Sequence, residues 1–386
     1  MSVISITDRT GKDSGIFKDG DLEVFLRRFI NDIEKNKYNK DETCWFNMSK
    51  IRWIDLFEVA CLIVCAAHLK QRNVCSGFKF FIPEDPDSKK EKYKTSKKLE
   101  RNEEQERGTW KALDFLKQFR FVDCINQKFE IEPNSKDIEG IPIIKNYDNA
   151  IALNARFVEN IDDERKALAD LRNNLERRFG PKVIEPKAIN KFCDYITQEL
   201  LINICEHAYR DVSVESEDKI GIISVKTRRL ESEKKIPEEI WRMGLNDAPE
   251  WYQGYMKALK SPTAFWETVI ADGGSGIPYT IRKQEEEKTD KFCFMSDIDL
   301  IKLPLNNPLK FPLETMKNEG GIERKGLYIV NDTMKELGGC IRVRSGHCAI
   351  TYCYPEPNSE RLEWEQTNLA ELDGTQIQVL IPIKYK

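Results

Sequence analysis

The N-terminal part of the chain combines short apolar runs with a helical pattern. Residues 43–49 (TCWFNMS) and 77–83 (GFKFFIP) are rich in apolar side chains and predict buried strands. Between them, residues 55–73 carry apolar positions at helical spacing over a wide face. Because parallel strands need a crossover connection, this strand–helix–strand unit predicts a parallel sheet. Further amphipathic helices are expected over 20–35 and 110–125.

The C-terminal half follows a different order. A helix over 187–210 precedes a strand over 220–230, which contains alternating Ile and Val. The remaining predicted elements are a strand at 266–271, a helix at 326–337, a strand pair at 340–355 and a strand at 375–383. Alternation of helices and strands in both halves predicts an α/β protein.

Four stretches interrupt these patterns. Residues 84–108 are strongly charged and indicate a loop or insertion, whereas 155–179 are charged but helical and are predicted to link the two halves. Residues 231–263 are rich in Trp and show no period, so we interpret them as an insertion. Residues 279–325 contain many charges and prolines.

Composition narrows the class of protein. A length of 386 residues favours two to three domains, and a hydrophobic fraction of 40% is enough for packed cores. The longest apolar run, 59–67, is far shorter than the ~20 residues that a membrane span needs. Net charge is −4 without a basic cluster, which argues against nucleic acid. The first residues lack signal-peptide features, so we expect a cytoplasmic protein.

The 11 cysteines are predicted to be reduced. Most have apolar neighbours, their number is odd, and no Cys-x-x-Cys pair occurs. Cys61 and Cys65 are four residues apart on a predicted helix, but we interpret them as small core residues and not as metal ligands. A reducing compartment follows from this interpretation.

One predicted helix carries a stripe of chemically capable side chains. In ITQELLINICEHAYRD (196–211), Glu199, Asn203 and His207 are four residues apart and therefore share one face. Their neighbours are mostly apolar, which is unusual for a solvated polar face. The sequence thus predicts a site at this helix.

Three glycine-containing segments add to this site. VIADGGSGIP (269–278) is a strand that ends at Asp272 and a turn whose glycines allow close backbone approach. GGIERKGLYIVNDTMKELGG (320–339) places glycines and basic residues before a helix, and helix N-termini bind phosphate. It lacks the Gly-Lys-Ser/Thr ending of a P-loop. GTQIQVLIPI (374–383) opens the last strand with Gly-Thr.

Taken in order, these four segments resemble the motif boxes of the GHKL superfamily. This group contains DNA gyrase, heat-shock chaperone ATPases, histidine kinases, MutL and the anti-sigma-factor kinases. The resemblance covers about 185–386. It implies a C-terminal α/β sandwich of the Bergerat type, with helices packed on one mixed sheet. It also implies ATP and Mg²⁺ as ligands.

The resemblance assigns roles to the matched positions. Asn203 would ligate Mg²⁺, and Glu199 would orient or deprotonate the attacking water. Asp272 would accept a hydrogen bond from the adenine amino group, which favours ATP over GTP because guanine presents a carbonyl there. His207 either reaches phosphate or only packs beside the site.

The other matched residues belong to the base and phosphate pockets. Gly274 and Gly276, followed by Ile277, would let the adenine and a lid over 279–325 approach. Thr375 would support the adenine pocket. The second glycine box departs from the usual Gly-x-Gly-x-Gly, so either the lid closes differently or basic residues take over phosphate contacts. The phosphate-binding candidates are Arg324, Lys325, Gly326 and Leu327.

The N-terminal half has a weaker resemblance. Residues 44–83 are similar to a STAS domain, the fold of anti-sigma-factor antagonists, in their strand, Ile54–Asp55 turn, long apolar helix and second strand. Such regulators carry a phosphorylatable Ser beside that Asp, whereas this chain has Leu56 and Phe57. A fixed interaction or scaffold role is therefore expected.

Three functional hypotheses follow. The leading one is an ATP-driven switch with slow hydrolysis, in which a lid and the N-terminal domain meet a protein partner of unknown identity. The others are a serine protein kinase acting on a separate partner and a nucleotide sensor without turnover. Homo-oligomer formation stays open. The expected domains are 1–150 (STAS-like), 151–184 (helical linker) and 185–386 (ATP-binding).

Overall fold

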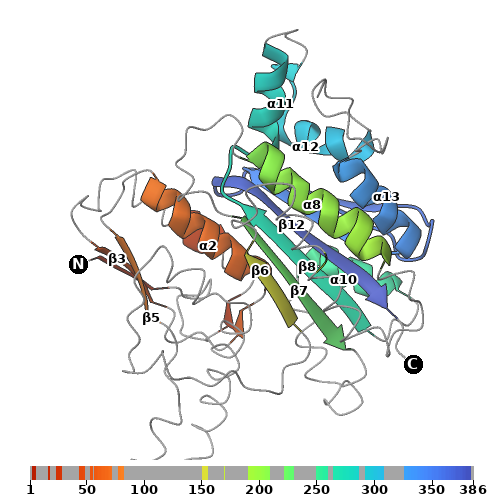
Figure 1. Ribbon diagram of the computed structural model, residues 1–386, viewed down its shortest axis with the longest axis horizontal. Helices are drawn as coiled ribbons and strands as arrows, with labels where there is room; N and C mark the ends of the chain where they lie inside the picture. Colours follow the sequence, from red (N-terminus) through yellow and green to blue (C-terminus); the bar gives the residue numbers. More distant parts are fainter. Residues whose placement is uncertain are drawn as a thin grey trace, which may run out of the picture. The chain divides into compact units, whose positions relative to one another are not determined.

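The computed structural model describes only part of the chain. The described residues are 2–5, 16–17, 23–27, 43–47, 53–54, 56–71, 77–81, 150–154, 169, 190–208, 221–229, 249–259, 264–286, 292–307 and 326–383. The predicted helix at 110–125, the charged stretch 84–108, most of the predicted linker, and Arg324 and Lys325 lie outside these residues. The chain divides into two units, Met1–Ala152 and Leu153–Lys386, and each is described by itself (Figure 1).

The first unit contains a three-stranded parallel sheet in the order β1-β3-β5. Its strands are β1 (Ser2–Ser5), β3 (Thr43–Asn47) and β5 (Gly77–Phe81), and helix α2 (Leu56–Gln71) connects β3 with β5. The strand–helix–strand unit predicted from sequence therefore has the parallel pairing expected of it. All ten described side chains of α2, from Leu56 to Cys65, are buried.

Two smaller features complete the described part of this unit. Strands β2 (Ile16–Phe17) and β4 (Trp53–Ile54) form a separate parallel pair. Residues 23–27, inside the predicted helix 20–35, are helical and bury Phe25 and Leu26.

The second unit is built on a seven-stranded sheet in the order β11-β10-β9-β12-β8-β7-β6. From β11 to β7 every neighbouring pair is antiparallel. The strands are β6 (Ala150–Asn154), β7 (Gly221–Arg229), β8 (Ala264–Asp272), β9 (Cys340–Gly346), β10 (Cys348–Cys353), β11 (Leu362–Gln366) and β12 (Leu372–Ile383).

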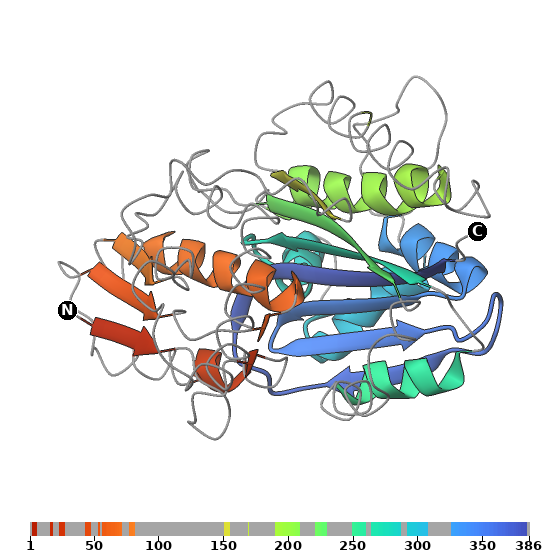
Figure 2. The same cartoon turned by 90° about the horizontal axis from the view of Figure 1, so that it is seen from below.

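Helices cover both faces of this sheet. Adjacent residues of a strand point to opposite faces, so Phe265 and Trp266 of β8 mark the two sides. The ring of Phe192 lies 5.6 Å from Trp266, and that of Tyr255 lies 6.2 Å from Phe265. The helix that contains Phe192 and helix α10 (Glu250–Ala258) therefore lie on opposite faces (Figure 2).

The helix predicted at 187–210 consists of three consecutive segments. They are the π-helical η3 (Phe192–Thr197), α8 (Gln198–Ile202) and the π-helical η4 (Asn203–Ala208). The other helices are α11 (Ile277–Glu286), α12 (Asp297–Asn306) and α13 (Leu327–Leu337). Helix α13 packs against η3, α8 and α12 (Figure 1).

The predicted insertion and lid contain helices that the sequence pattern did not reveal. Residues 231–263 include α10, which buries Trp251 and Tyr255. Residues 279–325 include most of α11 and all of α12, and α12 buries four apolar side chains despite Pro304. Ser296 caps α12 by accepting a hydrogen bond from the Asp299 amide.

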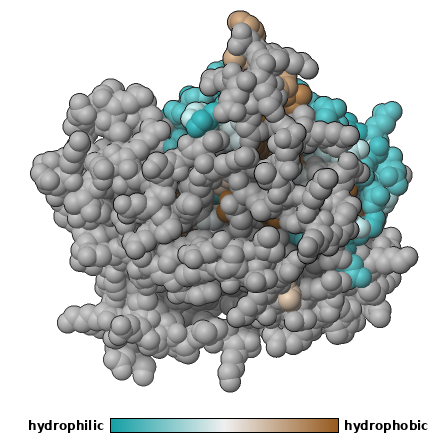
Figure 3. Space-filling model, turned by 45° about the horizontal axis from the view of Figure 1, so that its top comes forward, coloured by the Kyte–Doolittle hydropathy of each residue, from teal (hydrophilic) through white to brown (hydrophobic). Residues whose placement is uncertain are grey.

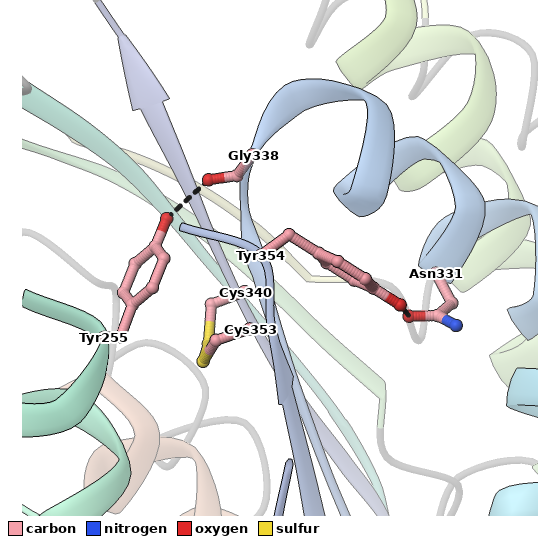
Figure 4. Close-up of a disulfide and its surroundings, with 6 residues drawn as sticks. All are labelled: Tyr255, Asn331, Gly338, Cys340, Cys353 and Tyr354. Carbon is pink, nitrogen blue, oxygen red and sulfur yellow. Dashed lines mark hydrogen bonds between the residues drawn. A yellow bond between two sulfur atoms is a disulfide. The ribbon is translucent and has the colours of Figure 1, made fainter. Parts of the chain in front are cut away.

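The expectation that all cysteines are free is wrong at one pair. Cys340 and Cys353 form a disulfide between β9 and β10, where the register sets them directly opposite (Figure 4). The two residues are 13 positions apart, and only the hairpin register shows that they meet. The bond lies in a buried cluster with Trp251, Tyr255, Phe265 and Leu380. Cys61 and Cys65 are both buried in α2, as expected of small core residues.

Within the described residues, none of the helices has the length and apolar content required to cross a lipid bilayer.

Candidate functional site

The residues predicted to bind a ligand lie mainly at one end of the second unit's sheet. Asp272 is the last residue of β8, and the turn Gly273–Gly276 leads from it into α11. Thr375 lies in the neighbouring strand β12, where it pairs with Ser345 of β9. The strand ends thus bring segments together that are about a hundred residues apart in sequence.

The carboxylate of Asp272 is buried and held by backbone donors. Its side chain is only 6% exposed, and Oδ1 accepts hydrogen bonds from the Gly274 amide at 2.9 Å and the Thr375 amide at 3.2 Å. Among the described residues, no group donates to Oδ2. Burial raises the pKa of Asp272 to about 7, while the two backbone hydrogen bonds oppose that shift. The fold therefore orients the carboxylate through Oδ1 alone.

The glycine turn touches the end of the helix that carries the polar stripe. The Ser275 amide donates to the Ala208 carbonyl oxygen at 2.9 Å. A Cβ at Gly274 would lie 1.8 Å from the same oxygen, so only glycine allows this approach. The first two segments singled out from sequence are therefore in direct contact.

Ser345 is a part of the site that sequence patterns did not reveal. Its hydroxyl accepts a hydrogen bond from the Ile277 amide and donates one to the Gly374 carbonyl oxygen, both at 2.9 Å. A Cβ at Gly276, where φ is +78°, would lie 2.6 Å from this hydroxyl oxygen. A single serine near the end of a strand carries no motif, and only the register of β9 against β12 places it here.

The polar stripe runs alongside β8 toward the same end of the sheet. Phe192 packs near Trp266 at the start of this helix, and Ala208 at its end contacts the turn after Asp272, so the helix runs parallel to β8. Glu199 and Asn203 lie between these anchors and are half-buried. The end of the helix that follows Asn203 therefore lies near the end of β8 that carries the buried carboxylate.

Helix α13 runs in the opposite direction. An ion pair joins Lys191, directly before η3, to Glu336 in the last turn of α13. Since the two helices are packed against each other, the N-terminus of α13 points toward the Asn203 end of its neighbour. Gly326 precedes this N-terminus with φ of +53° and no side-chain cap. Free amides and the positive end of the helix dipole are thus directed toward the site.

Three predicted site residues have side chains outside the described part of the chain. His207 lies in η4, but its side chain is outside the described part. Arg324 and Lys325 lie outside the described residues. Gly326 and Leu327 are described, and Leu327 is buried in the first turn of α13.

The described side chains could hold a metal ion only if phosphate oxygens supplied most of its ligands. Within the described residues, no three His, Cys, Asp or Glu side chains form a metal site. The buried Nδ2 of Asn203 has no hydrogen-bond partner, and as an N–H donor it suits an acceptor such as a phosphate oxygen, whereas only Oδ1 of this amide could ligate a cation. Mg²⁺ accepts an amide oxygen together with phosphate oxygens and water. Asn203 is the described residue that fits such an ion.

No protein-family model matches the chain, and no curated protein has significant sequence similarity to it. Any functional conclusion therefore depends on the residues described above.

Proposed function

We propose that the second unit binds Mg-ATP and uses binding and slow hydrolysis to switch the interaction of the protein with a protein partner. The proposal includes a GHKL-type fold, in which helices pack on the sheet that carries the nucleotide. The observation that supports it most is the carboxylate of Asp272, which is buried, oriented by two backbone amides and left with an acceptor oxygen.

Such a carboxylate suits a purine with an amino group at position 6. The exocyclic amine of adenine donates to Oδ2, whereas guanine would place a carbonyl oxygen against it. A buried polar group left unpaired costs about 1–3 kcal/mol, and more when it is charged. The pocket would therefore select ATP over GTP.

The phosphates and the metal would lie between α13 and the polar stripe. The N-terminal amides of α13, which follow Gly326, would bind phosphate oxygens. Asn203 would hold the magnesium ion, which supplies neutralisation of phosphate charge when bound. Arg324 and Lys325 would add basic contacts directly before the helix.

Hydrolysis would depend on Glu199. This carboxylate lies one helical turn before Asn203 on the same face and is half-buried. That position supports a role in orienting or deprotonating a water molecule beside the terminal phosphate. The kinase alternative would require the same water position to hold a hydroxyl of another protein.

An apolar surface beside the site supports a protein partner. Phe294 is 92% exposed and Tyr279 is 49% exposed, and both belong to the segment that starts at the glycine turn. Figure 3 shows apolar surface at the top of the molecule, where Figure 1 places α11. Nucleotide binding at the turn and partner binding at this surface would thus involve one continuous segment.

We also propose that the first unit is a STAS-like scaffold. Its parallel β3–α2–β5 arrangement supports this reading. Leu56 and Phe57, at the positions where related regulators carry a phosphorylatable Ser, support a fixed role. The cytoplasm is the proposed location.

Isothermal titration calorimetry of the full-length protein with ATP, with and without Mg²⁺, tests the nucleotide assignment. We expect magnesium-dependent binding that Asp272→Ala weakens by at least about tenfold, which corresponds to ~1.4 kcal/mol. Absence of binding by the unaltered protein, or full affinity in Asp272→Ala, would contradict the proposal.

Turnover measurements separate the enzyme hypotheses. Glu199→Ala should retain ATP binding while phosphate release falls at least about 100-fold, the usual scale of a general-base contribution. Unchanged phosphate release would exclude Glu199 from hydrolysis. Label transferred from ATP to a separate protein would instead support the kinase alternative.

A further inference from the structure

The hydroxyl of Ser345 joins the two segments that hold Asp272. Ser345 is completely buried in β9, and its Oγ accepts from the Ile277 amide while donating to the Gly374 carbonyl. Ile277 follows the glycine turn, and Gly374 precedes Thr375 in β12. A single side chain therefore spans the space between the turn and the strand.

Together with the hydrogen bonds to Asp272, these contacts form a closed circuit, called the ring below, that runs from Asp272 through the glycine turn to Ser345 and back through β12. Asp272 Oδ1 accepts from Gly274, which lies on the turn, and from Thr375, which follows Gly374. Each donor therefore lies within three residues of a backbone group that Ser345 holds. Movement of either segment would alter one of the two hydrogen bonds that orient the carboxylate.

The backbone around the ring has no spare room. A Cβ at Gly276 would lie 2.6 Å from Ser345 Oγ, and one at Gly374 would lie 1.9 Å from the Asp272 carbonyl oxygen. Both glycines also have φ of +78°. A side chain at either glycine would therefore push apart the segments that the serine hydroxyl joins.

We propose that Ser345 is a specificity-determining positioning residue, whose hydroxyl fixes the orientation of Asp272 so that Oδ2 distinguishes 6-amino from 6-oxo purines. This inference rests on the proposed nucleotide-binding function. Ser345 acts through the ring and not by touching the base. Loss of its hydroxyl frees the carboxylate to rotate, and a rotated carboxylate or a shifted backbone amide tolerates a 6-oxo group.

The experiment compares ATP with inosine triphosphate, which differs in carrying oxygen in place of the 6-amino group. Dissociation constants of both are measured for the unaltered full-length protein and for Ser345→Ala at pH 8, above the pKa of about 7 of Asp272, so that its carboxylate is ionised and accepts hydrogen bonds. We expect the preference for ATP to fall about tenfold in Ser345→Ala, as expected for loss of a hydrogen bond that orients a charged group. Ser345→Thr keeps a hydroxyl and should retain most of the preference.

Cys348→Ala serves as the matched control. Cys348 lies directly opposite Ser345 in β10, is buried and is a free thiol. Cys348→Ala therefore removes a buried side chain beside Ser345 without removing a hydrogen bond of the ring. If Ser345→Ala does not fold, Ser345→Cys replaces the hydroxyl with a weak donor of similar size and is expected to show the same drop.

The outcomes separate this inference from the proposed function. If the unaltered protein binds neither nucleotide, the proposed function fails and the inference fails with it. If the unaltered protein prefers ATP and Ser345→Ala keeps that preference, only the inference is overturned. Equal losses of preference in Ser345→Ala and Cys348→Ala would also overturn it, because packing alone would then explain the effect.

Discussion

At the scale of single residues, the chemistry of Asp272 follows from its surroundings. The carboxyl is buried at the end of a strand and receives two backbone hydrogen bonds on one oxygen. Burial disfavours the charged form more than these two bonds favour it, so the pKa is raised to about 7. The residue therefore titrates in the range where proteins are usually studied.

Replacing Asp272 with Asn should reverse the base preference. The Asn Oδ1 can keep both backbone hydrogen bonds, which forces the side-chain NH2 into the position of the free oxygen. That group donates, so it opposes the adenine amine and pairs with a 6-oxo group. We expect Asp272→Asn to lose about tenfold or more in ATP affinity and to gain affinity for inosine triphosphate. Competition binding with both nucleotides measures this, and an unchanged ATP preference would contradict the assigned contact.

The same residue predicts a pH dependence of stability in the free protein. The pKa of Asp272 is about 7 in the folded state against an ordinary value of 3.8. The folded state thus binds the proton more tightly, and the stability gained is complete below pH ~3.8 and lost as pH rises through ~7. At about 1.4 kcal/mol per pH unit, the loss amounts to at most about 4 kcal/mol.

Urea unfolding of the unaltered protein and of Asp272→Asn, carried out between pH 4 and pH 8, isolates this contribution. The difference in unfolding free energy between the two proteins should change in favour of Asp272→Asn as pH rises, because Asn does not titrate. A difference that stays constant across this range would show that Asp272 has an ordinary pKa. All other titrating groups are shared and cancel in the comparison.

At the scale of elements, the contact between the glycine turn and η4 leaves no room for a side chain at position 274. A methyl group at position 274 would lie 1.8 Å from the Ala208 carbonyl oxygen, so Gly274→Ala has to separate the turn from the helix. We expect a loss of about 2 kcal/mol or more in stability, the scale of overpacking a tight site, and a loss of ATP binding. Thermal unfolding and calorimetry test both.

Gly346→Ala is the control for that change. Gly346 has φ of +60° but open space around its Cβ position, so the substitution reports backbone strain alone. It should cost about 1–2 kcal/mol and leave nucleotide affinity unchanged. If the two variants behave alike, steric contact at Gly274 does not organise the site.

The β9–β10 hairpin supplies a second prediction at this scale. Cys340 and Cys353 are 13 positions apart and bonded inside the cluster of Trp251 and Tyr255. Loops of this size are stabilised by about 3 kcal/mol when closed by a disulfide. The double variant Cys340→Ala/Cys353→Ala should therefore unfold at lower denaturant concentration. Cys348→Ala, which removes a free thiol, is the control that measures how much stability is lost with a buried sulfur alone.

Thiol trapping in intact cells tests the proposed cytoplasmic location, because it measures whether Cys340 and Cys353 are reduced or bonded. Disulfides are rare in the cytosol of mesophiles, so the state of Cys340 and Cys353 reports the environment. Recovery of both as alkylated thiols supports the cytoplasm. Recovery of the bonded pair from cells would contradict that location.

At the scale of the whole molecule, β6 changes where the second unit begins. Residues 150–154 form the edge strand beside β7 in the described sheet, and they lie before residue 185, where the sequence predicts the ATP-binding domain to begin. A fragment of 149–386 keeps this strand, whereas one of 185–386 exposes β7 as an edge. We expect the longer fragment to have the higher melting temperature and solubility. Equal behaviour of both fragments would show that β6 contributes nothing to the sheet.

Local patterns were sufficient for most of the elements that surround the candidate site. Strands β7, β8 and β12 and helix α13 lie within a few residues of their predicted bounds, because period and turn residues are properties of adjacent positions. Helices α10 and α12 escaped this approach because each is short and their apolar positions depend on what packs against them. The edge strand β6 escaped it for the same reason.

The sequence by itself determined strands β7, β8 and β12, helix α13, the glycine turn after Asp272 and the polar stripe that includes Asn203. Each of these depends on spacing within about ten residues, where backbone geometry relates neighbours directly. Only the tertiary structure decided that Ser345 joins Ile277 to Gly374, and that Cys340 meets Cys353. Those contacts depend on strand order and register, which arise when the whole sheet minimises exposed apolar surface and unpaired backbone groups, and no short segment contains that information.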